Sequence, residues 1–315
     1  MSRLLHVDSG PYAPPAPACE LTAVSADGAR LHVEIHGPDG APAVVLAHGW
    51  TCSTAFWAAQ IRDLAADHRV IAYDQRGHGR SPASPACTTD ALADDLEAVL
   101  GATLAPGEQA VIAGHSMGGM TVMAASGRTA FREHTAAVLL CSTGSSQLVA
   151  ASTVVPMRPG RLRTWLTRRI LGSRAPLGPV TPLARRILKY GTMGPASAPH
   201  MVEACARIVH ACPRKVRYAW SHVLDLLDLD HGVRELDVPT AVVAGTADRL
   251  TPPAHARALA AALPHCTGLT ELPGIGHMTP IEAPELVTGK IRELVQAHMQ
   301  AHIQAHIRVV SEESA

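Results

Sequence analysis

Aromatic residues are scarce in this chain of 315 residues, since Phe, Trp and Tyr together make up 3% of it. Hydrophobic residues still make up 47%, so we expect a core built mainly from aliphatic side chains, and the composition excludes a disordered chain. Net charge is also lacking, because 27 basic and 27 acidic residues balance. This balance argues against nucleic acid as a partner.

Long apolar runs and paired cysteines are lacking too. No run approaches the roughly 20 residues of a membrane-spanning helix, and the N-terminus has no apolar stretch typical of a secretory signal. The seven cysteines are an odd number at irregular spacings without a Cys-x-x-Cys pair, which favours neither a disulfide framework nor a zinc site. The simplest interpretation is a cytoplasmic protein, with residues 1–18 as a flexible lead.

Short apolar runs rich in β-branched residues alternate with helical patterns along most of the chain. We predict a hairpin over 21–37 and further strands at 43–47, 69–74, 109–114, 136–141, 240–245 and 267–272. Helical patterns lie at 54–67, 89–100 and 253–263. Alternating strands and helices predict an α/β fold, in which helices flank a mostly parallel sheet.

One long segment interrupts this alternation between the sixth and seventh predicted strands. Residues 145–230 hold no convincing strand and are helical, rich in Arg and punctuated by Pro. An insertion of this length indicates a helical lid over the sheet. The core is then expected in two parts, 19–144 and 231–300, followed by a C-terminal helix end and tail at 301–315.

The motif Gly-His-Ser-Met-Gly-Gly at 114–119 follows an apolar strand and opens a helical stretch. This strand-turn-helix context is the one in which a Gly-x-Ser-x-Gly sequence forms a nucleophile elbow. Gly114 and Gly118 supply positions where a Cβ atom would clash in so sharp a turn. Ser116 is therefore the candidate nucleophile, placed at a helix N-terminus that favours negative charge.

A nucleophilic serine needs a base, and the base needs an orienting acid. Asp248 follows the strand at 240–245, and His277 lies in a Gly-rich loop after the last predicted strand. The chain order Ser116, Asp248, His277 is the one expected for a sheet enzyme of this kind. Three acids near the end of the lid compete with Asp248 for this role: Asp225, Asp228 and Asp230.

An oxyanion hole needs two backbone N–H donors. The residue after the nucleophile, Met117, is expected to supply one of them. The other is expected from Trp50, because the sequence His-Gly-Trp follows the strand at 43–47 directly. We expect Gly49 to permit an unusual backbone conformation there.

With these residues in place, the sequence resembles the α/β-hydrolase superfamily and is similar to its lidded carboxylesterase and lipase-like serine hydrolases. The segments that carry the resemblance are LAHGW (46–50), YDQRGHGRSPAS (73–84), GHSMGGM (114–120), AGTADRLTPP (244–253) and GIGHMTPIEAPE (274–285). The resemblance implies an eight-stranded, mostly parallel sheet, a lid after the sixth strand, and no metal or organic cofactor. Substrate identity is not implied.

The resemblance also narrows the chemistry. Superfamily members that form an alkyl-enzyme ester carry Asp at the elbow, whereas this chain has Ser116. Acyl transfer is therefore favoured, with a small-molecule carboxylic ester as substrate and an apolar acyl group suggested by the apolar lid. A C–C bond hydrolase and a cofactor-free perhydrolase on the same triad remain open, as does a non-catalytic ligand-binding protein on this scaffold.

Three other features have both a functional and a structural interpretation. Asp74 ends a strand before a Gly-rich loop and could be a catalytic carboxylate, but a structural hydrogen-bonding role is favoured. Cys141 is expected to be a buried thiol. His298, His302 and His306 have the i, i+4 spacing of metal ligands on a helix, yet a solvated helix face that drifts around the axis is favoured.

The lid carries the one charge asymmetry of the chain. Residues 145–222 contain 13 Arg and Lys against the single acid Glu203, a local charge of 13 − 1 = +12, which leaves 14 − 26 = −12 elsewhere. The segment RLRTWLTRRIL joins this charge to apolar residues, as an interfacial helix does. The lid is expected either to approach anionic membranes or acidic substrates, or to pair its arginines with acids of the core and so stay closed.

Overall fold

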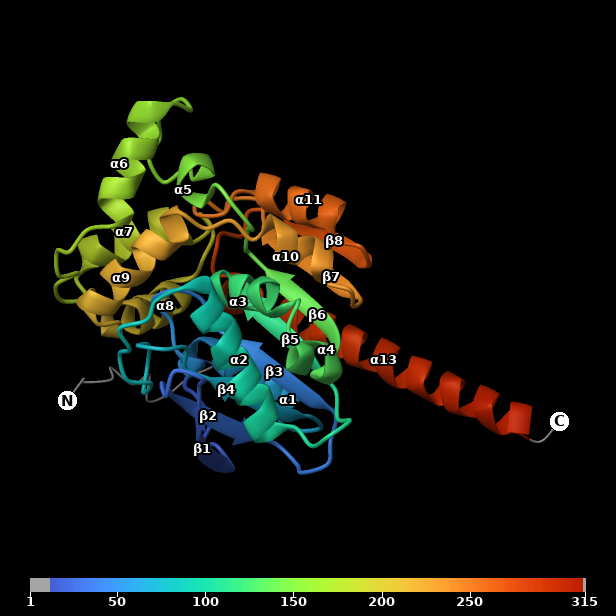
Figure 1. Ribbon diagram of the computed structural model, residues 1–315. Helices are drawn as coiled ribbons and strands as arrows, with labels where there is room; N and C mark the ends of the chain where they lie inside the picture. The colour runs from blue at the N-terminus through green and yellow to red at the C-terminus, as the bar shows by residue number, and fades with distance from the viewer. Residues whose placement is uncertain (1–11, 314–315) are drawn as a thin grey trace.

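The computed structural model describes residues 12–313, and the side chains of residues 12–300. An eight-stranded sheet forms its centre (Figure 1). The strands are β1 (Cys19–Val24), β2 (Arg30–His36), β3 (Ala43–Ala47), β4 (Arg69–Tyr73), β5 (Ala110–His115), β6 (Thr135–Cys141), β7 (Thr240–Gly245) and β8 (Cys266–Leu272). Every predicted strand is present, with ends that differ by one or two residues.

The strand order is β1-β2-β4-β3-β5-β6-β7-β8. β1 and β2 form the predicted hairpin, β2 pairs antiparallel with β4, and all later pairs are parallel. The mostly parallel α/β fold predicted from the sequence is therefore confirmed. The carboxyl ends of β5, β7 and β8 consequently lie at one edge of the sheet.

Burial on both faces explains why the central strands are continuous apolar runs rather than alternating ones. Every residue of β3, β5, β6 and β7 is buried. One face packs against α2 (Thr89–Thr103), α3 (Met117–Ala125) and α11 (Pro253–Ala262), and the other against α1 (Ala58–Leu64) and α13 (Pro284–Glu313). Few aromatic side chains are needed, because Val, Ile, Leu, Ala and Met fill both cores.

The stretch predicted as one helix at 54–67 is divided in the structure. A 3₁₀ turn, η1 (Thr54–Trp57), precedes α1. The backbone N–H of Thr54 donates to the Asp74 carboxylate at 2.8 Å, which satisfies one donor at the start of the turn. The helical pattern therefore identified the segment, but a long-range contact determines where its first turn begins.

The remaining helices include those of the segment that the sequence predicts as the lid. Between β6 and β7 lie α5 (Leu148–Ala151), α6 (Arg161–Leu171), α7 (Pro182–Thr192), α8 (Pro199–Ala211), α9 (Arg214–Asp225) and α10 (Asp230–Glu235); α4 (Thr129–His134) and α12 (Thr279–Glu282) complete the set. Figure 1 shows α6, α7 and α9 together at the end of the molecule remote from the C-terminal part of α13. We keep the name lid for residues 145–230, and its boundaries remain a prediction.

Part of the predicted N-terminal lead is packed against the core. Residues 1–11 lie outside the described residues, but Tyr12 is buried, and its hydroxyl donates to the carbonyl of Ile281 at 2.8 Å. Its ring stacks on His200, with 5.9 Å between the ring centroids. The packed chain thus includes Tyr12, ahead of the expected start at residue 19.

Within residues 12–313, no helix combines the length and the apolar character that crossing a bilayer requires. The seven cysteines are all free thiols, and four of them, Cys141 included, are buried. The thiol of Cys141 has a strongly raised pKa because it is fully buried.

Candidate active site

Ser116 occupies the sharp turn between β5 and α3. Its backbone lies at φ 51° and ψ −116°, a strained region for a residue other than glycine. A Cβ atom on Gly114 would come within 2.6 Å of the Gly118 backbone, and one on Gly118 within 2.0 Å of the Ala47 carbonyl oxygen. Both glycines are thus required for the close approach of backbone segments that holds the turn.

Asp248 and His277 lie side by side at the carboxyl ends of β7 and β8. His277 Nδ1 is 2.8 Å from Asp248 Oδ2, and both side chains are almost completely buried. The structure therefore brings together the predicted acid and the predicted base, which are 29 residues apart in the sequence. The competing acids contact other groups: Asp225 pairs with Arg168, Asp230 accepts from Ser145, and Asp228 accepts from the Asp230 N–H.

Thr251 completes this pair and was not predicted. Its hydroxyl donates to Asp248 Oδ2 at 2.8 Å and lies 3.2 Å from His277 Nδ1. Backbone N–H groups of Leu250 and Thr251 donate to Asp248 Oδ1 at 2.8 and 2.9 Å. The Asp248 carboxylate is thus held by three donors besides His277, which fixes the position of its oxygens.

A cavity of about 490 Å³ lies above this edge of the sheet. Ser116 and His277 both line it, together with Trp50 and mainly apolar side chains of the lid. The predicted nucleophile and base therefore share one cavity. Ser116 is 9% exposed and His277 3%, so both side chains are largely shielded from solvent.

The predicted oxyanion-hole residues flank Ser116. Met117 is the first residue of α3, where no preceding helical carbonyl accepts its N–H, and Trp50 lines the cavity. His48 Nδ1 is 2.8 Å from the Gly49 carbonyl oxygen, and the Gln75 N–H donates to His48 Nε2. Since peptide N–H and C=O groups point in opposite directions, fixing the Gly49 carbonyl also fixes the Trp50 N–H.

Glycine is required at position 49 for a reason other than the unusual backbone conformation that we expected there. Gly49 is not among the residues with positive φ; instead, a Cβ atom there would come within 2.7 Å of His115 Nδ1 and 3.1 Å of the Ser116 side chain. Close approach to the elbow is what requires glycine. The left-handed residue of this loop is Thr51, at φ 65°, and a β-branched residue in that region is unusual enough to indicate strain.

Glu282 is a second residue that sequence reasoning missed. Its buried carboxylate accepts from the backbone N–H groups of Gly194, Gly276 and Met278 at 2.7, 3.2 and 3.1 Å, and from the Ser197 hydroxyl at 2.6 Å. The His277 N–H also donates to the Thr192 carbonyl at 2.8 Å. This carboxylate therefore ties the end of α7 to the loop that carries His277.

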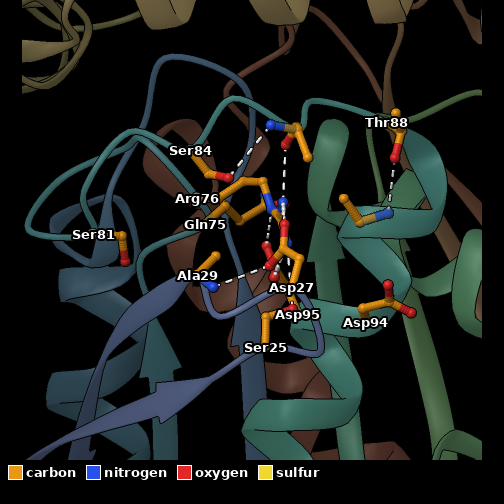
Figure 2. Close-up of polar contacts among 12 residues, drawn as sticks. Ser25, Asp27, Ala29, Gln75, Arg76, Ser81, Ser84, Thr88, Asp94 and Asp95 are labelled. Carbon is orange, nitrogen blue, oxygen red and sulfur yellow. Dashed lines mark hydrogen bonds and ion pairs between the residues drawn. The ribbon is translucent and has the colours of Figure 1, made fainter.

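Asp74 has the structural role that was favoured for it. Its carboxylate accepts from the backbone N–H groups of Thr54 and Arg80 and is fully buried, which raises its pKa to about 6. Figure 2 shows the adjoining network, in which the buried Arg76 is bonded to Asp27 and Asp95. The loop after β4 is thus held by polar contacts of its own.

Three histidines near the elbow are neutral at physiological pH because burial disfavours their charged forms. The pKa of His48 falls to about 3 and that of His78 to about 4, and the pKa of His115 is also well below its usual value. His115 Nε2 is 2.9 Å from the His277 carbonyl oxygen, so His115 supports the loop that carries His277.

Among the described side chains, one cluster has the composition of a metal site. Glu20, His32 and Glu34 place one possible ligand atom each within 4.8 Å of the others. Glu20 is already paired with the two terminal guanidinium nitrogens of Arg80, and Glu34 with His32. This cluster therefore does not support a metal site. His302 and His306 lie beyond the described side chains.

The site combines a mainly apolar cavity, a contacting carboxylate and imidazole, and a serine at a strained elbow. This combination is of the kind found in hydrolases, and the comparison with known proteins agrees. The profile of the α/β hydrolase fold matches residues 42–284, and the chain belongs to this family. Its sequence is 36% identical over 96 residues to 3-oxoadipate enol-lactonase 1 of Acinetobacter baylyi and 42% identical over 81 residues to the esterase YbfF of Escherichia coli.

These two matches cover 30% and 26% of this chain and 35% and 31% of the respective relatives, about a third of their length. A solved structure of a thermophilic esterase from Thermogutta terrifontis superposes with a TM-score of 0.71 at 26% identity, covering 89% of this chain and 99% of that one. The similarity in fold thus extends over most of the chain, whereas that in sequence is confined to part of it.

Proposed function

We propose that the protein is a serine hydrolase that cleaves carboxylic esters through an acyl-enzyme intermediate. Ser116 is the nucleophile, His277 the general base and acid, and Asp248 the orienting acid. The observation that carries the proposal is the 2.8 Å contact between His277 Nδ1 and Asp248 in a cavity that Ser116 also lines. This contact favours a proton on Nδ1, which leaves Nε2 free to accept the proton of Ser116.

The reaction proceeds in two halves. Ser116 Oγ attacks the ester carbonyl as His277 takes its proton, and the oxyanion forms against the N–H groups of Trp50 and Met117. His277 then donates that proton to the leaving alcohol, and the acyl group stays on Ser116. A water molecule, activated by His277, releases the acid and restores the serine. No cofactor takes part in these steps.

We propose an apolar acyl group of medium or greater length for the substrate. The cavity of about 490 Å³ is lined by Met120, Leu148, Val149, Val154, Ile170, Leu171, Leu177, Ile187, Leu188, Val209, Leu224 and Leu250. Burying each methylene of an acyl chain against such a lining is favourable by about 0.8 kcal/mol. Hydrolysis of p-nitrophenyl esters should therefore be faster for butyrate and longer acyl groups than for acetate.

The biological setting is part of the proposal. Seven free thiols suit a reducing compartment, so we propose a cytoplasmic location. We also propose that the positive charge of the lid allows peripheral contact with anionic membranes. A carbon–carbon bond hydrolase and a perhydrolase would use the same three residues, and product analysis separates them from an esterase.

A fluorophosphonate probe tests the enzyme assignment directly. The native protein should be labelled at one site, the variant Ser116→Ala should not, and the control Ser84→Ala should be labelled like the native protein. Equal labelling of native protein and Ser116→Ala would contradict the proposal. Absence of any labelling in folded native protein would favour a non-catalytic binding protein instead.

A further inference from the structure

Most of the large hydrophobic side chains that the structure leaves exposed lie in one part of the lid. Eight of the twelve exposed large hydrophobics among the described residues fall between residues 157 and 190. They are Met157, Leu162, Trp165, Ile170, Leu177, Leu183, Ile187 and Tyr190. α7 contributes no buried residue at all. A concentration of apolar surface of this kind marks an interaction site.

The exposed residues form stripes along α6 and α7. In α7, Leu183, Ile187 and Tyr190 follow the i, i+4, i+7 spacing of one helix face, and they are 66%, 63% and 42% exposed. Arg186 lies next to this stripe, three residues after Leu183. In α6, the guanidinium of Arg169 lies over the Trp165 ring at 5.8 Å. Each helix thus presents apolar and cationic groups together.

The lid cations are not neutralised by the acidic core. The ion pairs that lid Arg and Lys residues make among the described side chains all stay within the lid: Arg168 with Asp225, and Arg185 and Arg207 with Glu203. Besides Arg163, Lys189 and Arg217, which donate to backbone carbonyls, seven others have no carboxylate within ion-pair distance in the described part of the chain. These are Arg158, Arg161, Arg169, Arg174, Arg186, Arg214 and Lys215. The expected pairing of lid arginines with core acids is therefore not observed.

The apolar face is continuous with the catalytic cavity. Ile170, Leu177, Ile187 and Tyr190 are exposed and also line the cavity that contains Ser116. A surface that covered α6 and α7 would therefore lie over the cavity mouth. An apolar molecule could then pass from that surface to the serine without crossing water.

We infer that α6 and α7 dock on an anionic lipid layer and that the layer supplies the ester substrate to the cavity mouth. Arg161, Arg169 and Arg186 on these helices complement an anionic surface, while Trp165, Leu183 and Ile187 enter its interfacial region. The inference about substrate supply rests on the proposed esterase function. The docking surface stands independently of it.

Vesicle co-sedimentation at low salt tests the docking surface, with phosphatidylcholine alone and with equal parts of phosphatidylcholine and phosphatidylglycerol. We expect partitioning onto the mixed vesicles only, reduced by added salt. Arg186→Gln should weaken it about fivefold and Arg161→Gln/Arg186→Gln about 25-fold, because each surface cation contributes about one such factor. Arg30→Gln, an exposed cation on β2, is the matched control and should leave it unchanged. Equal partitioning onto both vesicles, or equal loss in Arg30→Gln and Arg186→Gln, would overturn the inference.

Fluorescence locates the contact. Trp165 is the only one of the four tryptophans that is exposed, so mixed vesicles should shift the emission of the native protein to shorter wavelength and leave Trp165→Phe unshifted.

Substrate supply is measured as hydrolysis of a long-chain ester embedded in the mixed vesicles, relative to soluble p-nitrophenyl butyrate. The double arginine variant should lose the first activity and keep the second. If the native protein hydrolyses neither ester, the esterase proposal is refuted. If it hydrolyses the soluble ester but not the embedded one, substrate supply from the lipid layer is refuted.

Discussion

Thr251 shows how a residue without chemistry of its own governs the site. Its hydroxyl donates to Asp248 Oδ2, the same oxygen that contacts His277, so it fixes the carboxylate in the position where His277 needs it. A hydrogen bond to a charged group contributes about 1.5 to 3 kcal/mol. Thr251 is therefore a positioning residue for the acid-base pair.

Thr251→Val keeps the side-chain shape and removes this donor. We expect kcat for p-nitrophenyl butyrate to fall about tenfold, with KM nearly unchanged, because substrate contacts stay while the orientation of His277 loosens. Thr103→Val is the matched control, since its buried hydroxyl donates to the Val99 carbonyl far from the cavity. The control should lose stability but not kcat. An unchanged kcat in Thr251→Val would contradict a positioning role.

At the scale of elements, strand ends and loops assemble the site. β5, β7 and β8 end at one edge of the sheet and deliver Ser116, Asp248 and His277 there. These three positions were predictable because a local motif or a strand end marks each of them. Thr251 lies only three residues after Asp248, but no motif marks it. Glu282 was not predictable, since its contacts with Gly194 and Ser197 join segments that only the folded chain brings together.

Glu282 joins two such segments, and its removal should loosen both. Glu282→Gln keeps the size but replaces one acceptor oxygen by a donor, so the N–H groups of Gly194 and Gly276 lose charged partners. We expect faster amide hydrogen exchange in residues 192–197 and 276–278, a stability loss of about 2 kcal/mol, and lower kcat. Glu293→Gln on α13, where Glu293 pairs with Lys290 at the surface, is the control. Unchanged exchange in Glu282→Gln would exclude this coupling.

The division of the predicted helix at 54–67 follows the same rule. Its apolar periodicity was read correctly, but Asp74, distant in sequence, binds the Thr54 N–H and sets a 3₁₀ first turn. Gly49 is a similar case, since its requirement comes from the nearby His115 and Ser116 rather than from its own dihedral angles. Sequence patterns thus identified elements and motifs, whereas contacts between them decided the details.

At the scale of the whole molecule, buried histidines make stability depend on pH. His48, His78 and His115 have pKa values far below 6.5 in the folded state, so the unfolded chain binds three protons that the folded chain does not as pH falls below 6.5. Asp74 opposes this with one proton, because its folded pKa is raised to about 6. The contribution of these groups to the free energy of unfolding is therefore greatest above pH 6.5 and decreases on acidification.

For these four groups, a net difference of about two protons corresponds to about 3 kcal/mol per pH unit between pH 6 and 4.5. Urea unfolding across this range, at constant ionic strength, measures the slope. His78→Asn should reduce it by about half, since the variant lacks one of the titrating groups. A slope near zero, or one of opposite sign, would contradict the assignment of these histidines as neutral in the fold.

Charge is also distributed at the scale of the molecule. Residues 145–222 carry a charge of +12 and the rest of the chain −12. The ion pairs of the lid cations among described residues nevertheless stay within residues 145–230. Direct pairing therefore does not hold the lid against the core. Hydrogen bonds at Glu282 and Thr192 do so at one end, while Arg161, Arg169 and Arg186 of α6 and α7 have no carboxylate partner among the described side chains.

Turnover by Ser116→Ala tests the central claim, that this serine is the nucleophile of an ester hydrolase. The variant keeps the backbone of the elbow and removes only the hydroxyl. We predict that kcat for p-nitrophenyl butyrate falls by on the order of 10⁴-fold or more, while the far-ultraviolet circular dichroism of the folded protein is unchanged. A folded Ser116→Ala protein with kcat within about tenfold of the native value would contradict the account.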